Sequence, residues 1–186
     1  GCMAAMPFWI TGLPRSRTAW FAVAMRGPHS TCAHELTTEA RSFDHFKALW
    51  VGGNGAVYRG NSDSACGLHI ERILHEIRPK TLVITRPLGE VLDSAHECLG
   101  WRLPTWLCDR LERLACALTV SHPLIKHVRF QDLTDRDALI EAADWLVPGH
   151  GQQAVALMDF NVQVTRAHIE RLRDLDHTRW HMAEAA

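Results

Sequence analysis

The chain has 186 residues, of which 47% are apolar and 22% charged, and its formal net charge is −1. This length suits one domain with a substantial core. We expect a single domain over residues 1–186, with its core in 7–148 and a helical C-terminal segment in 149–182. Without a basic excess, neither nucleic acid nor an acidic membrane is expected as a partner, so any anion site must be local.

Six cysteines are scattered without a C-x-x-C pair, and twelve histidines are dispersed along the chain. Because no zinc-ligand spacing occurs, we expect no metal and mostly buried, reduced thiols. The N-terminus lacks a charged segment followed by a long apolar run, and no stretch of about 20 apolar residues occurs. These features predict a cytoplasmic protein without a transmembrane helix.

Short apolar strands alternate with segments of helical periodicity, which favours an α/β fold: a three-layer sandwich around a mainly parallel sheet. Strands are expected at residues 7–11, 30–33, 81–85 and 125–130. Helices are expected at residues 18–25, 38–49, 70–77, 88–98, 105–118, 135–146 and 164–175. Thr134 is the expected N-cap of the helix that begins at 135. The glycine-, serine- and asparagine-rich stretch 51–67 predicts a surface loop or lid.

The stretch FWITGLPRSRTAW, residues 8–20, reads as a strand, a loop and the start of a helix. Such a loop points backbone N–H groups and the positive end of the helix dipole at an anion. Arg15 and Arg17 flank Ser16 here, which is unfavourable beside that dipole unless an anion is bound. The spacing differs from the phosphate loop G-x-x-x-x-G-K-[ST], because Arg17 and Thr18 stand where Gly-Lys is expected.

A second anion signal is TLVITRPLGEVLDS, residues 81–94. Arg86 closes a predicted strand, and Ser94 lies eight residues later, about two turns into the next helix. An arginine and a serine so placed can reach one phosphate together. Ligands of open α/β sheets bind beyond the carboxyl ends of the strands, where this pair is expected.

Together these stretches resemble the sulfotransferases that use 3′-phosphoadenosine 5′-phosphosulfate (PAPS), specifically a short bacterial or phage-type member. The phosphosulfate loop of that family is similar to P-[KR]-S-G-T-[TS]-W/L, and its 3′-phosphate element to R-[DN]-P-x-D-x-x-x-S. The matching residues here are Pro14, Arg15, Ser16, Thr18 and Trp20 for the first element, and Arg86 and Ser94 for the second. A weaker likeness, to v-x-Y-E-D-L-x-x-D-P, falls on Phe130, Gln131, Asp132 and Leu133.

The resemblance covers roughly residues 7–148 in the right order and implies a fold like that of the P-loop nucleoside triphosphate hydrolases. It departs from the family pattern in three places. Pro87 follows the arginine directly, Arg17 replaces the loop glycine, and nothing like R-K-G-x-x-G-x-W occurs. If position 17 needs a positive φ, an arginine there is strained or the loop is altered.

The resemblance implies a role for each matched position. Arg15 would contact the bridging and terminal oxygens of the phosphosulfate, and Arg86 with Ser94 would hold the 3′-phosphate. The 5′-phosphate would be wrapped by Ser16, Thr18 and the backbone N–H groups of residues 16–19. The expected cofactor-binding residues are Pro14, Arg15, Ser16, Arg17, Thr18, Ala19, Trp20, Arg86 and Ser94. Trp20 is an adenine wall in this interpretation and a core side chain in the other, and Arg17 is expected to add a second cation to the leaving phosphate.

Transfer of a sulfuryl group also needs a base for the proton of the acceptor. Glu35 follows the expected second strand, where tyrosylprotein sulfotransferases look similar, and it is our first candidate. His34 is the second candidate. His69 is a third, although it lacks the T-H-x-P pattern of the cytosolic enzymes and a structural role is expected for it.

The hypothesis from the sequence is therefore a transferase that moves the sulfuryl group of PAPS to a hydroxyl or amine acceptor. The acceptor is a small molecule or a polymer, and its pocket is expected from residues 51–67 and 99–107 or from a second subunit in a homodimer. One alternative is a P-loop nucleotide kinase or phosphatase. The missing G-K-[ST] triplet, and the lack of an obvious acidic Mg²⁺ ligand after a strand, count against it. Another alternative is a non-catalytic nucleotide-binding protein of the same fold.

Overall fold

The computed structural model describes residues 5–53, 55–99 and 104–160. One sheet of five strands lies at its centre, and every pair of neighbouring strands is parallel. The strands are β1 (Met6–Gly12), β2 (Ser30–His34), β3 (Tyr58–Ser62), β4 (Lys80–Thr85) and β5 (Ile125–Arg129), in the order β2-β3-β1-β4-β5. The predicted α/β class with a parallel sheet is confirmed.

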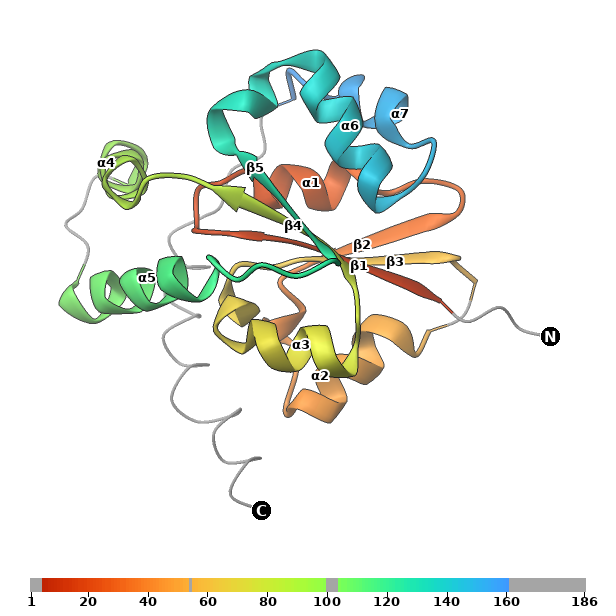
Figure 1. Ribbon diagram of the computed structural model, residues 1–186, viewed down its shortest axis with the longest axis horizontal. Coiled ribbons are helices and arrows are strands. Elements are labelled where there is room, and N and C mark those ends of the chain that lie inside the picture. Colours follow the sequence, from red (N-terminus) through yellow and green to blue (C-terminus); the bar gives the residue numbers. More distant parts are fainter. Residues whose placement is uncertain (1–4, 54, 100–103, 161–186) are drawn as a thin grey trace.

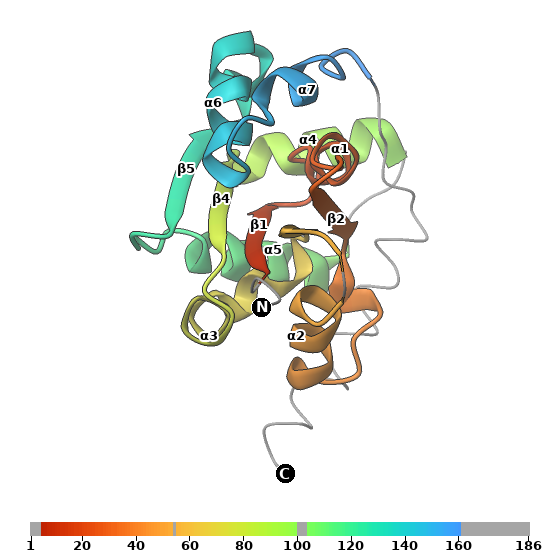
Figure 2. The ribbon, with the colours of Figure 1, turned by 90° about the vertical axis from the view of Figure 1, so that its right-hand side faces the viewer.

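Helices cover both faces of the sheet, which gives three layers (Figure 1). One face carries α1 (Thr18–Ala24), α6 (Arg136–Leu146) and α7 (Gly151–Val155). The opposite face carries α2 (Phe43–Val51), α3 (Ile70–Glu76) and α5 (Thr105–Ala117), as the view turned by 90° also shows (Figure 2). Helix α4 (Leu88–Leu99) lies beyond the end of β4, and three 3₁₀ helices, η1 (Leu36–Thr38), η2 (Ala65–His69) and η3 (Phe130–Thr134), complete the described elements.

The alternation of side chains along β1 builds two cores. Phe8 and Ile10 face α1 and α6, whereas Trp9 faces α2, α3 and α5. All three are fully buried, as expected for a central strand with both faces covered. Within the described ranges, no helix combines the length and the apolar character that crossing a membrane requires.

The predicted surface loop at 51–67 is wrong in its second half, because β3 lies there between β1 and β2. Only Tyr58 in this strand has a strong β propensity, so its residues show no strand periodicity. A glycine is needed at position 60 because neighbouring strands fill the space: a Cβ there would lie 2.1 Å from the Phe8 ring and 2.9 Å from Cys32 Sγ. Packing against its neighbours therefore explains this strand better than its own residues do.

Smaller corrections concern helix ends. Asp135, not Thr134, caps α6, since its side chain accepts a hydrogen bond from the Ala138 N–H. The helix expected at 38–49 begins at Phe43, where Ser42 is the N-cap, and η1 precedes it. The helix expected at 164–175 lies outside the described residues. Of the described cysteines, Cys32 and Cys66 are buried free thiols, and Cys116 is exposed.

The carboxyl ends of all five strands meet at one edge of the sheet, because every strand runs the same way. After β1 the chain enters α1 on one face, whereas after β2 and β3 it enters helices on the other. Such a reversal at neighbouring strands is where ligands bind in open α/β sheets. The loops at this edge therefore hold the candidate site.

Candidate functional site

The loop after β1 has an unusual backbone. Arg15 and Arg17 have φ of 68° and 65°, which is the left-handed region that glycine prefers. The loop is also tight, because a Cβ on Gly12 would lie 2.6 Å from the carbonyl oxygen of Ile84 on β4. Position 17 therefore does need a positive φ, and each such residue costs about 1–3 kcal/mol. Strain of this size persists where the surrounding structure enforces it.

Arg17 is held on the far side of the loop. Its guanidinium donates to the carbonyls of Leu133 at 2.9 Å and Met158 at 3.2 Å, and lies 4.8 Å from the centre of the Trp20 ring. Burial lowers the pKa of Arg17. This arrangement ties the loop to η3 and to the chain after α7. The side chain is thus engaged with backbone carbonyls, and its expected contact with a leaving phosphate stays a prediction.

Trp20 is part of the core beneath α1. It is 3% exposed, its indole N–H donates to the Leu157 carbonyl at 2.8 Å, and its ring meets Phe21 edge to face. Of the two interpretations of this residue, the structure favours core packing. Ala19 beside it is buried in the same helix.

The two predicted anion elements come together. Arg15 donates from Nε to Ser94 Oγ at 3.5 Å, and Arg86 donates from Nη1 to the carbonyl of Arg15. These contacts join segments that are 79 and 71 residues apart in the chain. The loop after β1, the end of β4 and helix α4 therefore form one cationic cluster, which we call the arginine cluster: Arg15, Arg86 and Ser94.

Arg86 is also fixed from its other side. Its guanidinium lies 3.9 Å from the centre of the Phe130 ring at the end of β5, and its Nε lies 3.8 Å from Glu90 Oε2. The Arg86 side chain is 14% exposed, whereas that of Glu90 is 58% exposed. Because the aromatic face and the loop carbonyl orient it, the guanidinium is positioned before any ligand arrives.

The remaining loop residues face inward. Pro14 lines a pocket beside the loop, and Ser16 is fully buried. Ser16 Oγ is enclosed without a hydrogen-bond partner among the described residues. Thr18 begins α1, and its N-cap Arg17 makes no side-chain capping bond. A buried hydroxyl group without a partner is costly, so Ser16 marks a place where a ligand or a water molecule would be stabilised.

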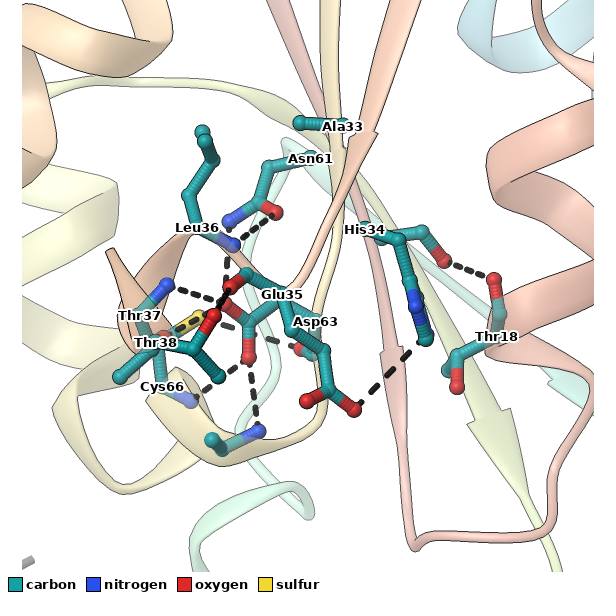
Figure 3. Close-up of polar contacts among 12 residues, drawn as sticks. Thr18, Ala33, His34, Glu35, Leu36, Thr37, Thr38, Asn61, Asp63 and Cys66 are labelled. Atoms are coloured by element: carbon teal, nitrogen blue, oxygen red, sulfur yellow. Dashed lines mark hydrogen bonds and ion pairs between the residues drawn. The ribbon is translucent and has the colours of Figure 1, made fainter. Parts of the chain in front are cut away.

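Glu35 lies directly after β2, at φ 56°, and is 4% exposed. Its Oε1 is 3.7 Å from His34 Nε2, so the first two candidate bases are neighbours (Figure 3). Ser62 at the end of β3 links them to the loop: its carbonyl accepts from the Glu35 N–H, and its hydroxyl donates to the Thr18 carbonyl at 2.5 Å. The third candidate, His69, is at the junction of η2 and α3.

Asp63 is a buried carboxylate that the sequence interpretation missed. It follows β3, is 0% exposed and accepts five hydrogen bonds (Figure 3). The donors are the N–H and hydroxyl groups of Thr37, the side-chain amide of Asn61, and the N–H groups of Ala65 and Cys66. An acidic residue thus does follow a strand, contrary to the sequence interpretation, but its oxygens are occupied by protein donors.

Asp63 affects its neighbours in two ways. It holds η1, the turn directly after Glu35, against the end of β3. Burial, and then the Asp63 charge, raise the pKa of the Cys66 thiol well above the usual value. Among the described residues, no group of three or more histidine, cysteine or acidic side chains is arranged to hold a metal ion. The only signal for Asp63 in the sequence is an aspartate beside Asn61 and Ser62, within a stretch that reads as a loop.

Comparison with known protein families, with curated proteins and with solved structures finds no match to this chain.

Proposed function

We propose that the protein is a sulfotransferase that moves the sulfuryl group of PAPS to an acceptor, on a fold related to that of the P-loop nucleoside triphosphate hydrolases. The observation that carries the proposal is the arginine cluster. A donor with a phosphosulfate and a separate 3′-phosphate needs two cationic groups at once. The contacts of Arg86 with the Arg15 carbonyl and of Arg15 with Ser94 support such a two-anion site.

In this proposal the acceptor oxygen attacks the sulfur atom while the bond from sulfur to the bridging phosphate oxygen breaks. 3′-Phosphoadenosine 5′-phosphate (PAP) leaves with the electron pair of that bond. Arg15 stabilises the negative charge that develops on the bridging oxygen, and losing one such donor commonly costs about 10²–10³ in rate. Glu35 takes the proton of the acceptor hydroxyl, with His34 as the alternative base.

The nucleotide kinase alternative has less support. The one buried carboxylate beside β1 among the described residues, Asp63, accepts five hydrogen bonds from protein donors. To bind Mg²⁺, the Asp63 carboxylate would have to give up some of these hydrogen bonds. Arginine at positions 15 and 86 supplies positive charge without a metal ion.

Thermal shift with two ligands tests the proposal: PAP alone and ATP with magnesium. PAP should raise the melting temperature of the wild type, and Arg15→Ala and Arg86→Ala should lose this rise. The matched control is Arg72→Ala. Arg72 also lies over an aromatic ring, 4.0 Å from the centre of Phe43, and pairs with a glutamate four residues on, but it is on α3. Stabilisation by ATP with magnesium in preference to PAP would overturn the proposal.

Turnover separates an active enzyme from a non-catalytic nucleotide-binding protein. PAPS is incubated with the wild type and with Glu35→Gln, with water as the sulfuryl acceptor, and release of PAP and sulfate is measured. Glu35→Gln should keep the thermal response to PAP and lose turnover. Undiminished turnover would remove Glu35 from the mechanism and leave His34 as the base to examine.

A further inference from the structure

Arg59 is a buried cation at the opposite end of the sheet from the arginine cluster. It is the second residue of β3, so it lies near the amino edge of the sheet, whereas the loops of the candidate site follow the carboxyl ends. The residue is only 7% exposed. Burying a whole charge is costly unless the charge is paired and hydrogen-bonded. A guanidinium group in this position is therefore expected to have an acceptor.

The described part of the chain offers Arg59 no such acceptor. Its side chain makes no hydrogen bond and no ion pair there, and its Nε is enclosed without a partner. The buried Arg110 differs, because it donates to the Ala65 carbonyl at 3.2 Å. A buried donor without an acceptor bears the full cost of losing its water. Arg59 is thus a place where an added acceptor would be stabilising.

The turn after α2 passes directly over this guanidinium group at Gly53. A Cβ on Gly53 would lie 2.5 Å from Arg59 Nη1 and 3.1 Å from Nη2, so only a glycine lets the backbone come this close. The guanidinium therefore lies beyond the C-terminal end of α2, where the negative end of the helix dipole favours a cation. That attraction is smaller than the cost of burying an unpaired charge, so the helix alone does not compensate Arg59.

Solvent reaches this position from the side of β2. That strand is at the edge of the sheet, and Thr31 on it is the register partner of Arg59. Register partners on neighbouring strands point to the same face of the sheet, and Thr31 is exposed. The Thr31 hydroxyl group therefore lies at the open rim beside Arg59 and can donate a hydrogen bond to the same ligand.

We propose that Arg59, Gly53 and Thr31 form a binding site for a small oxyanion: a phosphate, a sulfate or a carboxylate. The guanidinium group presents a planar fork of donors that matches two oxygens of such an anion. The anion supplies the acceptor and the negative charge that Arg59 lacks within the described chain. The proposal goes beyond the proposed function, because none of these three residues belongs to the arginine cluster and no PAPS is involved.

Thermal shift of the full chain with phosphate, sulfate, acetate and chloride, at one ionic strength, tests this site. Each oxyanion that binds should raise the melting temperature along a saturation curve, by about 3–6 °C at ten times the fitted Kd, whereas chloride should not. Arg59→Met should lose a saturable response that the double variant Arg15→Ala, Arg86→Ala keeps. Loss of the response in the double variant alone, an equal response to chloride, or no response to any oxyanion would overturn the proposal.

Two milder variants keep the test decisive if Arg59→Met does not fold. Gly53→Ala places a Cβ against the guanidinium group and should raise the Kd for phosphate about tenfold, through the loss of a charge-assisted hydrogen bond. The matched control is Gly89→Ala on α4, where a Cβ would meet nothing within 4 Å, and it should leave that Kd unchanged. Arg59→Lys keeps the charge without the fork and should bind phosphate more weakly than the wild type. Circular dichroism checks folding, and equal effects of the two alanine variants would overturn the assignment.

Discussion

Asp63, after β3, and Arg86, after β4, are both charged residues at the carboxyl edge of the sheet, but their surroundings differ. The Asp63 carboxylate is fully buried and accepts five hydrogen bonds, all from nearby chain segments. Arg86 contacts one loop carbonyl, an aromatic face and an exposed glutamate, and its side chain keeps 14% exposure. The first arrangement stabilises a turn, whereas the second leaves a cation accessible to a ligand.

This difference indicates that the two sides of the carboxyl edge of the sheet have different roles. The side of β2 and β3 supports η1, directly after Glu35, through the hydrogen bonds that the Asp63 carboxylate accepts. The side of β1 and β4 holds positive charge in a strained loop, and its buried Ser16 hydroxyl has no partner among the described residues. Variants on the first side should therefore change stability most, and variants on the second side should change ligand response most.

Replacing Asp63 by alanine should have the largest effect on stability. The change leaves five donors without their acceptor, and breaking a buried network of this kind costs on the order of 3–5 kcal/mol. Urea unfolding measures the free-energy difference. The control is Asp132→Ala, which removes an ion pair with Arg129 at the surface and should cost at most about 1 kcal/mol. Equal losses would show that Asp63 is not the support described above.

Replacing Arg15 by alanine should have the largest effect on turnover and little effect on folding. PAPS turnover should fall about 10²–10³-fold, because the charge on the leaving phosphate loses its partner. Urea unfolding should show a change within about 1 kcal/mol, since the side chain is half-buried and its hydrogen bond to Ser94 Oγ is long. A loss of stability as large as that of Asp63→Ala would contradict the contrast between the two sides.

Arg17 tests whether the loop is held by side-chain contacts or by backbone conformation. Arg17→Ala removes the bonds to Leu133 and Met158 but keeps a side chain at positive φ, and it should cost about 2 kcal/mol. Arg17→Gly loses the same bonds but relieves the strain, so it should cost about 1 kcal/mol less than the alanine variant. Thermal unfolding of both variants measures the difference. A less stable glycine variant would show that the left-handed conformation is not strained.

The smallest expected effect comes from the thiol beside Asp63. Burial, and then the charge of Asp63, raise the pKa of Cys66 above its ordinary value near 9.0. The unfolded chain therefore loses this proton near pH 9 while the folded protein keeps it, so the free energy of unfolding falls as pH rises above 9. At pH 10 the loss is about 1 kcal/mol. Cys66→Ala, measured by urea unfolding from pH 8 to 10, should show a shallower decline than the wild type; an equal decline would contradict the shift.

Cys32 on β2 is a second buried thiol with a raised pKa, so Cys32→Ala can be compared with Cys66→Ala in the same unfolding experiment. Burial raises the pKa of Cys32 to about 12, while the nearby charge of Arg26 and a backbone hydrogen bond at Ser62 lower it in part. Both thiols should also resist alkylation by iodoacetamide at pH 8, whereas the exposed Cys116 should react.

Local sequence was sufficient for much of the fold and part of the site. The strands near residues 7, 30, 81 and 125 and most helices follow from periodicity and breakers, because each has its own apolar pattern. The loop at Arg15 and the arginine at the end of β4 were also predictable, since both are short-range patterns of strand, turn and helix. Glu35 was predictable as the residue after a strand, but its contact with His34 was not, because successive side chains of a strand point to opposite faces and Glu35 leaves β2 with a left-handed backbone.

Tertiary structure decided the rest, because the deciding contacts join segments far apart in the chain. Tyr58–Ser62 is a strand because it pairs with both β1 and β2, and at Gly60 the side chains of Phe8 and Cys32 leave no room for a Cβ. Asp63 has a structural role because the chain after β2, at Thr37, lies beside the end of β3 and donates hydrogen bonds to its carboxylate. The two anion motifs became one cluster because β1 and β4 are neighbours in the sheet. The contacts of Arg17 with carbonyls more than 100 residues away were also beyond the reach of the sequence, and its role as a second cation for the phosphate stays a prediction.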